Sequence, residues 1–168
     1  MNIKKMQLDN IPQLVVMDHN AYGQYGADEE YFRKKLTSPK TKILIAEKEG
    51  LITGFTVFEM MEQDEMPKNF SDLKINKLLK GKWMYIIAFT TETNYEDVKY
   101  DSQLLRSAEK IARNLKCNTF CVPLSKDHPY PKAYNFFEIN GYQKVGSIKW
   151  KASPTEKIDC YLYLKSTS

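Results

Sequence analysis

One continuous stretch in the second half of the chain constrains the fold most, because its character changes twice. Residues 83–90 form an almost unbroken apolar run of aromatic and β-branched types, which is typical of a strand buried on both faces. Residues 91–101 are polar and lack periodicity, so they are predicted to form a loop. Apolar residues then recur at helical spacing as far as Leu115, and Asp101 or Ser102 is the predicted N-cap. A buried strand that leads into a helix N-terminus is a common place to hold an anionic ligand.

The composition is that of an ordinary soluble globular protein, with 42% apolar and 27% charged residues. A chain of 168 residues is most simply one domain, residues 1–168. The net charge of +4 comes from interleaved acidic and basic residues, so nucleic-acid binding is not predicted. No apolar run approaches the ~20 residues of a membrane span, and the N-terminus has no signal-peptide core. A cytoplasmic protein without membrane contact is predicted.

Metal binding is not predicted, because the residues that usually bind zinc are few and badly spaced. The only histidines are His19 and His128, and the three cysteines are Cys117, Cys121 and Cys160. Free cysteine behaves as a small hydrophobic residue. The cysteines are therefore predicted to be reduced, buried and structural.

Periodicity and turn residues predict the remaining elements. Asp9 and Asp28 are predicted to cap two successive helices. A third helix is expected to begin at Pro131 and to end before Gly141. Strands are expected at residues 2–7, 42–47, 51–62, 118–124, 142–151 and 158–165. The second and third of these strands form a hairpin, whereas 83–90 and 118–124 pair in parallel through a right-handed crossover. The predicted fold class is a mixed α/β sheet with flanking helices.

Residues 63–82 form an inserted segment between the hairpin and the central strand. Ser71 is predicted to cap a short amphipathic helix within 71–80. Its packed residues are expected to be Leu73, Ile75 and either Leu78 or Leu79. This helix is expected to pack on the domain or on a second subunit, so a homodimer is one of the two arrangements considered.

Two local patterns resemble the GCN5-related N-acetyltransferase (GNAT) superfamily. The run Pro131-Lys-Ala133-Tyr-Asn-Phe-Phe137-Glu-Ile-Asn-Gly141-Tyr142 resembles the family's "N-P-x-A-x-x-x-Y-e-x-x-G-F" helix and following strand. The run from Ser102 to Cys117 resembles the helix that follows the family's phosphate loop. The predicted order of elements agrees as well, so the likeness spans the whole chain. It implies a GNAT-like fold.

The resemblance also implies a reaction and a cofactor. It implies direct transfer of an acetyl group from acetyl-CoA to a primary amine of a small molecule or peptide, within one ternary complex. The pantetheine is expected to pair with backbone groups of the central strand at Ala88, Phe89 and Thr90. The pyrophosphate is expected to meet N–H groups at the start of the next helix, at Lys99, Tyr100, Asp101 and Ser102.

The candidate catalytic residues follow from the same resemblance. The family's catalytic tyrosine matches Phe137, which has no proton to donate; Tyr134, three residues earlier on the same helix, is the predicted replacement. Glu59 is the predicted base that deprotonates the amine through water, and Glu62 is a second candidate. His128 has an unperturbed pKa that suits a base at neutral pH, but an exposed loop histidine is the simpler interpretation.

The predicted phosphate loop departs from the family pattern. No glycine lies between Gly81 and Gly141. Residues 92–101 carry four carboxylates against one lysine, a net charge of −3. Each carboxylate within ~5 Å of a pyrophosphate would cost on the order of 1 kcal/mol. The alternative function is therefore a binding or interaction module that keeps the GNAT fold without CoA, or that takes a different acyl carrier.

Overall fold

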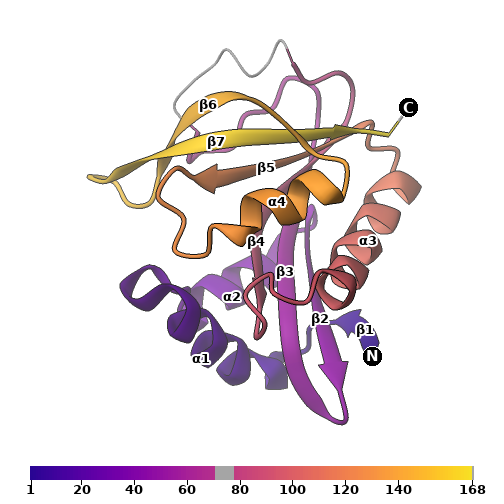
Figure 1. The fold of residues 1–168 in the computed structure, drawn as a ribbon, viewed down its shortest axis with the longest axis vertical. Helices are drawn as coiled ribbons and strands as arrows, with labels where there is room; N and C mark the ends of the chain where they lie inside the picture. Colours follow the sequence, from indigo (N-terminus) through magenta and orange to yellow (C-terminus); the bar gives the residue numbers. More distant parts are fainter. Residues whose placement is uncertain (71–77, 168) are drawn as a thin grey trace. The chain divides into compact units, whose positions relative to one another are not determined.

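The computed structural model describes residues 1–70 and 78–167. Seven strands form one mixed sheet in the order β1-β2-β3-β4-β5-β7-β6, and helices flank it (Figure 1). The predicted fold class is thereby confirmed. The chain falls into two compact units, the first comprising Met1–Glu59 and Ile87–Lys110, the second Met60–Ile86 and Ile111–Ser168.

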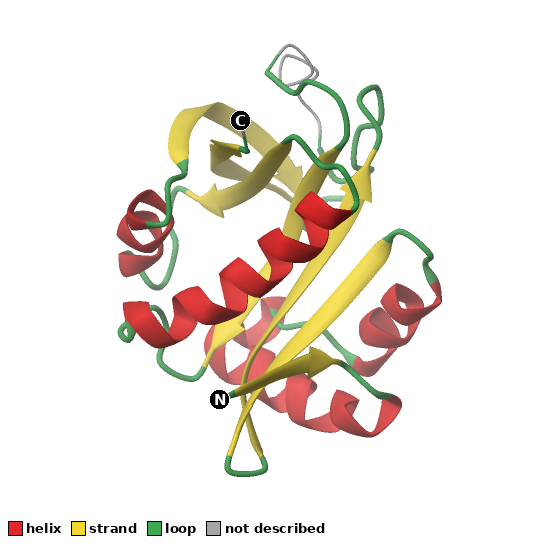
Figure 2. Cartoon of the chain, turned by 90° about the vertical axis from the view of Figure 1, so that its right-hand side faces the viewer, coloured by secondary structure: helices red, strands yellow, loops and turns green. Residues whose placement is uncertain are grey.

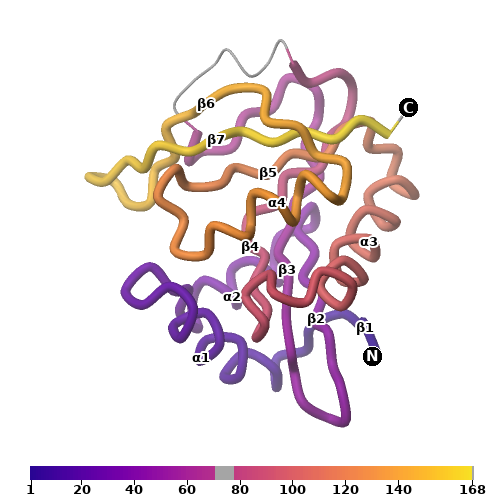
Figure 3. Tube along the Cα trace, in the orientation of Figure 1, coloured from indigo at the N-terminus to yellow at the C-terminus, as the bar shows by residue number. Residues whose placement is uncertain are grey.

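In chain order the elements are β1 (Asn2–Lys5), α1 (Ile11–Tyr22), α2 (Glu29–Thr37), β2 (Thr41–Lys48), β3 (Leu51–Met61), β4 (Trp83–Thr91), α3 (Val98–Asn114), β5 (Thr119–Ser125), α4 (Lys132–Ile139), β6 (Gln143–Lys151) and β7 (Lys157–Ser166). Short 3-10 turns at Leu8–Asn10 and Gly23–Tyr25 flank α1. Figure 2 distinguishes these elements by type, and Figure 3 traces the backbone. No helix in the described ranges is long and apolar enough to cross a membrane.

The first unit is built on the antiparallel strands β1, β2 and β3. The predicted hairpin of β2 and β3 is confirmed, and it turns at Glu49 and Gly50, which both have positive φ angles. One face of β2 and β3 buries a hydrophobic cluster against the first two helices, with Leu14, Phe32 and Phe55 among its members. Burial of each such side chain contributes roughly 1.5–3 kcal/mol. This cluster holds α1 and α2 on the sheet.

The second unit is built on β5, β7 and β6, which pair antiparallel in that order. The first residues of β4 join β5 in parallel, from Trp83↔Thr119 to Tyr85↔Cys121, so the predicted parallel pairing is confirmed. The last two strands form a hairpin at the C-terminal end of the trace (Figure 3). The three cysteines are buried free thiols, as predicted.

Two predicted helix starts are wrong, and both errors concern the capping residue. Asp9 does not cap α1, because the chain first makes a 3-10 turn in which Asn10 Oδ1 accepts a hydrogen bond from the Gln7 N–H at 2.8 Å. The helix predicted to start near Ser102 starts at Val98 instead. Asp28 does cap α2 as predicted, since its Oδ1 accepts the Tyr31 N–H at 2.8 Å.

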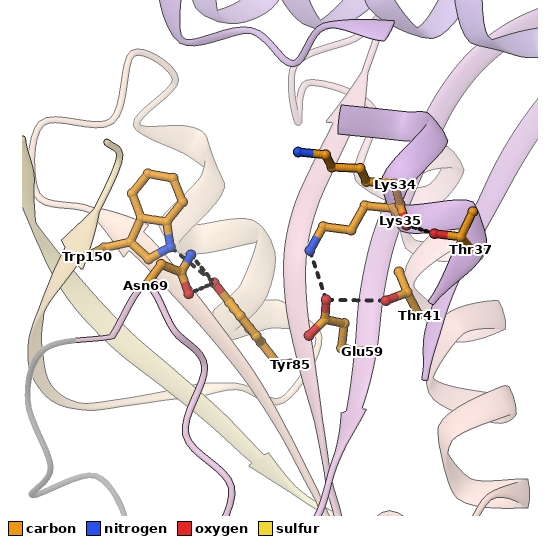
Figure 4. A network of polar contacts seen from close by, with 8 residues as sticks. All are labelled: Lys34, Lys35, Thr37, Thr41, Glu59, Asn69, Tyr85 and Trp150. Carbon is orange, nitrogen blue, oxygen red and sulfur yellow. Dashed lines mark hydrogen bonds and ion pairs between the residues drawn. The ribbon is translucent and has the colours of Figure 1, made fainter. Parts of the chain in front are cut away.

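The segment that enters β4 is anchored to the second unit by aromatic side chains. The Tyr85 hydroxyl accepts hydrogen bonds from Trp150 Nε1 and Asn69 Nδ2, both at 3.0 Å (Figure 4). Phe70 packs edge-on against Tyr85, with ring centroids 4.9 Å apart. The Trp83 indole N–H donates to a backbone carbonyl before this segment, that of Glu62, at 3.0 Å. These contacts hold Glu62, Asn69 and Phe70, which precede residues 71–77, against side chains of β4.

The helix predicted within 71–80 falls mainly on residues 71–77, which lie outside the described residues. Leu78 and Leu79 are described, and they differ sharply. Leu78 is 46% exposed, whereas Leu79 is 2% exposed. Of the two leucines considered for packing, Leu79 is therefore the buried one.

We expect Leu79→Ala to lower the free energy of unfolding by about 2–5 kcal/mol, because it leaves a cavity in the core. The matched variant Leu78→Ala removes the same atoms from an exposed side chain and should change it by less than ~0.5 kcal/mol. Urea unfolding followed by circular dichroism measures both. Equal losses for the two variants would contradict this assignment of the buried leucine.

Candidate functional site

The end of β4 holds the backbone groups predicted to meet an acyl donor. The Ala88 carbonyl oxygen accepts a hydrogen bond from the hydroxyl of Thr56, which lies on β3, at 2.8 Å. This carbonyl therefore faces β3. Successive carbonyls along a strand point to opposite edges, so the Phe89 carbonyl faces away from β3.

The Phe89 carbonyl is not open, because Tyr95 has folded back onto it. The Tyr95 hydroxyl donates to this oxygen at 3.0 Å, and the two rings stack with centroids 5.9 Å apart. The Tyr95 side chain is 4% exposed. Burial raises its pKa well above the usual value, so the hydroxyl keeps its proton and remains a donor at neutral pH.

The backbone of this loop is strained at two successive residues. Asn94 has φ +50° and Tyr95 has φ +69°. Asparagine tolerates the left-handed region, but a bulky aromatic residue rarely adopts it. No property of the sequence pointed to Tyr95, since its role depends on this unusual backbone.

A buried carboxylate fastens the start of the loop. The hydroxyls of Thr91 and Thr93 donate to Oδ2 of Asp101 at 3.0 and 2.7 Å. Asp101 is 1% exposed, and its Oδ1 has no hydrogen-bond partner among the described residues. Burial raises the pKa of this carboxyl, while hydrogen bonds from the two hydroxyls and from the Tyr95 N–H oppose the shift.

The N-terminus of α3 is capped by a carboxylate of the chain itself. Asp97 Oδ1 accepts the Tyr100 N–H at 3.0 Å, and its carbonyl accepts the Asp101 N–H at 2.9 Å. Two of the predicted pyrophosphate donors, the N–H groups of Tyr100 and Asp101, are therefore already bonded. Ser102 is buried one turn inside the helix, which leaves only Lys99 of the predicted set in the exposed first turn. In this arrangement the residues do not fit a CoA pyrophosphate.

Thr90, the third β4 residue predicted to contact pantetheine, forms a side-chain hydrogen bond to α1. Its hydroxyl donates to Oδ1 of the buried Asp18 at 2.9 Å, and Asp18 Oδ2 accepts the Ala27 N–H at 2.7 Å. Burial raises the pKa of Asp18. This carboxylate ties the connection between α1 and α2 to the end of β4. Its role could not be predicted from the sequence, because a single aspartate on a helix gives no distinctive signal.

Glu59, the predicted base, lies on β3 in the first unit. Its Oε1 accepts Lys35 Nζ at 2.8 Å and the Thr41 hydroxyl at 3.2 Å (Figure 4). The side chain is 13% exposed. Glu62, the second candidate, is exposed. Glu59 is thus a largely buried, paired carboxylate whose negative charge is balanced by an ammonium group.

Tyr134, the predicted proton donor, lies on α4 in the second unit. Its hydroxyl donates to the Ser125 carbonyl and accepts the His128 N–H at 3.3 Å. Burial raises the pKa of Tyr134, so it is protonated at neutral pH. Phe137 is fully buried between the rings of Phe136 and Tyr142 and has no polar role.

His128 is partly buried, so its interpretation as an exposed loop histidine is wrong. Burial lowers its pKa to about 4, and its Nδ1 accepts the Tyr130 N–H at 3.0 Å. The lowered pKa leaves the ring neutral at pH 7.

A groove of about 610 Å³ lies in the first unit. Its lining residues come from α1, the start of β3 and the end of β4: Pro12, Gln13, Val16, Met17, Asn20, Ala21, Leu51, Ile52, Thr91, Glu92 and Asn94. Glu59 is absent from this lining. Among the residues that the structure describes, no group of three or more His, Cys, Asp or Glu side chains is placed to hold a metal ion.

The sequence matches no family model and no curated protein. Solved structures, in contrast, resemble nearly the whole chain. NAA60 from Arabidopsis thaliana, in complex with a bisubstrate analogue, gives a TM-score of 0.76 at 13% identity over 98% of this chain and 97% of that chain. The ribosomal-protein-S18-alanine N-acetyltransferase from Escherichia coli gives 0.72 at 10% identity over 99% and 94%. The PaiA N-acetyltransferase from Thermoplasma acidophilum, in complex with coenzyme A, gives 0.65 at 12% identity over 98% of each chain.

Identities this low establish the fold and leave the activity to separate argument. The likeness nevertheless covers the predicted features that matter: a mixed sheet, the parallel pair β4 and β5, and the helix α3 between them. With TM-scores of 0.65 to 0.76 over at least 98% of its length, the chain has the fold of the GCN5-related N-acetyltransferase (GNAT) superfamily.

Proposed function

We propose that this chain is an acyltransferase that moves an acetyl group from acetyl-CoA to a primary amine of a small molecule or peptide. The observation that supports this most is the match in fold to N-acetyltransferases along almost the entire chain. Fold likeness is an analogy, so the assignment depends on the site residues and on a direct assay.

Tyr134 is the residue proposed to donate a proton to the leaving group of the acyl donor. Its raised pKa keeps the proton available, and the hydroxyl would have to exchange its bond to the Ser125 carbonyl for one to the substrate. Glu59 is proposed to accept the proton of the amine through water. The Lys35 ammonium at 2.8 Å keeps this carboxylate oriented.

A second candidate function is a binding or interaction module that does not use CoA. Two contacts favour it, namely the Tyr95 hydroxyl on the Phe89 carbonyl and the Asp97 carboxylate on the start of α3. The first experiment therefore measures thiol release from acetyl-CoA in the presence of a panel of peptide N-termini and polyamines. Release that depends on the amine supports the transferase. No release with any amine, together with no heat from millimolar CoA in calorimetry, supports the module.

We expect Tyr134→Phe to lower kcat by about 100-fold or more, because a positioned general acid contributes at least that much. The matched variant Tyr163→Phe removes a hydroxyl from the same aromatic cluster, where it bonds Glu138 Oε1 at 3.5 Å, and should retain kcat. Steady-state kinetics on both variants measures this. Equal loss of kcat in the two would show that the cluster needs its packing rather than the proton of Tyr134.

We expect Glu59→Gln to lower kcat/KM for the amine by about tenfold to 100-fold, because glutamine cannot accept a proton. Glu62→Gln makes the same change at an exposed carboxylate and serves as the control. If Glu59→Gln keeps the wild-type kcat/KM, Glu59 is a structural partner of Lys35 and not the base.

A further inference from the structure

The loop between β4 and α3 places groups of the chain where the proposed donor would have to bind. The Phe89 carbonyl, which faces away from β3, accepts the Tyr95 hydroxyl at 3.0 Å. The first turn of α3, where N–H groups lack intrahelical acceptors, holds the Asp97 carboxylate at 3.0 Å from the Tyr100 nitrogen. The Tyr95 hydroxyl thus occupies the carbonyl expected to bond a pantetheine amide. The Asp97 carboxylate occupies the helix N-terminus expected to bind the pyrophosphate.

We propose that residues 92–97 are a plug that closes the donor site in the free protein and must be displaced before CoA binds. This inference rests on the proposed transferase function. The plug explains why a chain with this fold carries an acidic loop without glycine at this position. A glycine-rich turn would leave the helix N-terminus open to an anion, whereas this loop satisfies that end with its own side chain.

Specific contacts hold the plug in its strained backbone conformation. Asn94 and Tyr95 both hold left-handed backbone conformations, which persist only where surrounding contacts enforce them. Here the enforcing contacts are the Tyr95 hydroxyl bond, the stacked Phe89 ring, and the Thr93 hydroxyl on Asp101 at 2.7 Å. The loop is therefore held at both its start and its centre.

The same loop has features that favour opening. Asp101 Oδ1 is buried without a hydrogen-bond partner among the described residues, which destabilises the closed arrangement. The side chains of Glu92, Glu96 and Asp97 are exposed and carry charges of one sign. Opening would hydrate the buried oxygen and relax the two strained residues. The side-chain bonds that help to hold the closed form, those of the Tyr95 hydroxyl among them, can be removed by single substitutions.

Two substitutions test the plug through the affinity for CoA. The apparent affinity of a ligand falls with the fraction of protein in the binding-competent form, so weakening the closed form should tighten binding. Tyr95→Phe keeps the ring and removes the hydroxyl's bonds to the Phe89 carbonyl and to Tyr22, and should tighten CoA about twofold to tenfold. Asp97→Asn keeps a good N-cap but removes the charge. It should tighten CoA about fivefold at low salt, and by less at about 0.5 M salt.

Each substitution has a matched control within the first unit. Thr56→Val also removes a hydroxyl from a β4 carbonyl, that of Ala88, but on the opposite edge of the strand. Asp28→Asn makes the same change at the N-cap of α2, where the carboxylate accepts the Tyr31 N–H at 2.8 Å. Both controls should leave the CoA dissociation constant within about twofold of wild type.

Isothermal titration calorimetry with CoA, on proteins with confirmed cooperative melts, separates the outcomes. Tighter binding by Tyr95→Phe and Asp97→Asn, but not by the controls, supports the plug. If the wild type binds CoA as tightly as both variants and acetylates an amine, the plug is wrong and the transferase function stands. If no variant binds at millimolar CoA, both the plug and the transferase function are wrong. Because Asp97→Asn keeps the cap and removes only a charge, tighter binding by this variant alone reports relieved charge repulsion and contradicts the plug.

Discussion

The backbone of β4 sets the main constraint on this structure, because a buried strand must find a partner for each N–H and C=O group. On the β3 edge, Thr56 takes the Ala88 carbonyl, and the Glu92 N–H donates to the Thr53 carbonyl at 2.9 Å. On the other edge, the first residues of β4 pair in parallel with β5. Farther along, the Phe89 carbonyl is satisfied by the Tyr95 hydroxyl, and this need fixes the path of the following loop.

The element order was predictable from the sequence, because each element carries its own pattern. The apolar run of β4 and the apolar stripe of α3 have residue spacings that burial enforces, and Glu49 and Gly50 mark the hairpin turn. The start of α3 was not predictable in the same way. Asp97, Asp101 and Ser102 are all acceptable caps by residue type, and only the observed bond from the Tyr100 N–H to Asp97 distinguishes them. Leu78 and Leu79 present a similar ambiguity in a short segment.

The site was predictable only where residue type alone carries information. The lack of glycine and the excess of carboxylates in the loop could be read directly, and they raised the question of CoA binding. The hydrogen-bond partners of Glu59 and Tyr134 could not be predicted, because tertiary packing brings Lys35 and Ser125 into contact with them. Tyr95 gave no signal at all, since a tyrosine in a polar loop is ordinarily exposed.

A loop that opens would reconcile two functions that otherwise exclude each other. The closed loop accounts for the features that favour a module without CoA, and the proposed opening would let the same chain act as a transferase. The most direct test is a crystal structure grown with CoA. We expect residues 92–97 to move, Tyr95 to leave the Phe89 carbonyl, and an amide of the ligand to take its place. CoA bound with the Tyr95 hydroxyl still on Phe89 would contradict it.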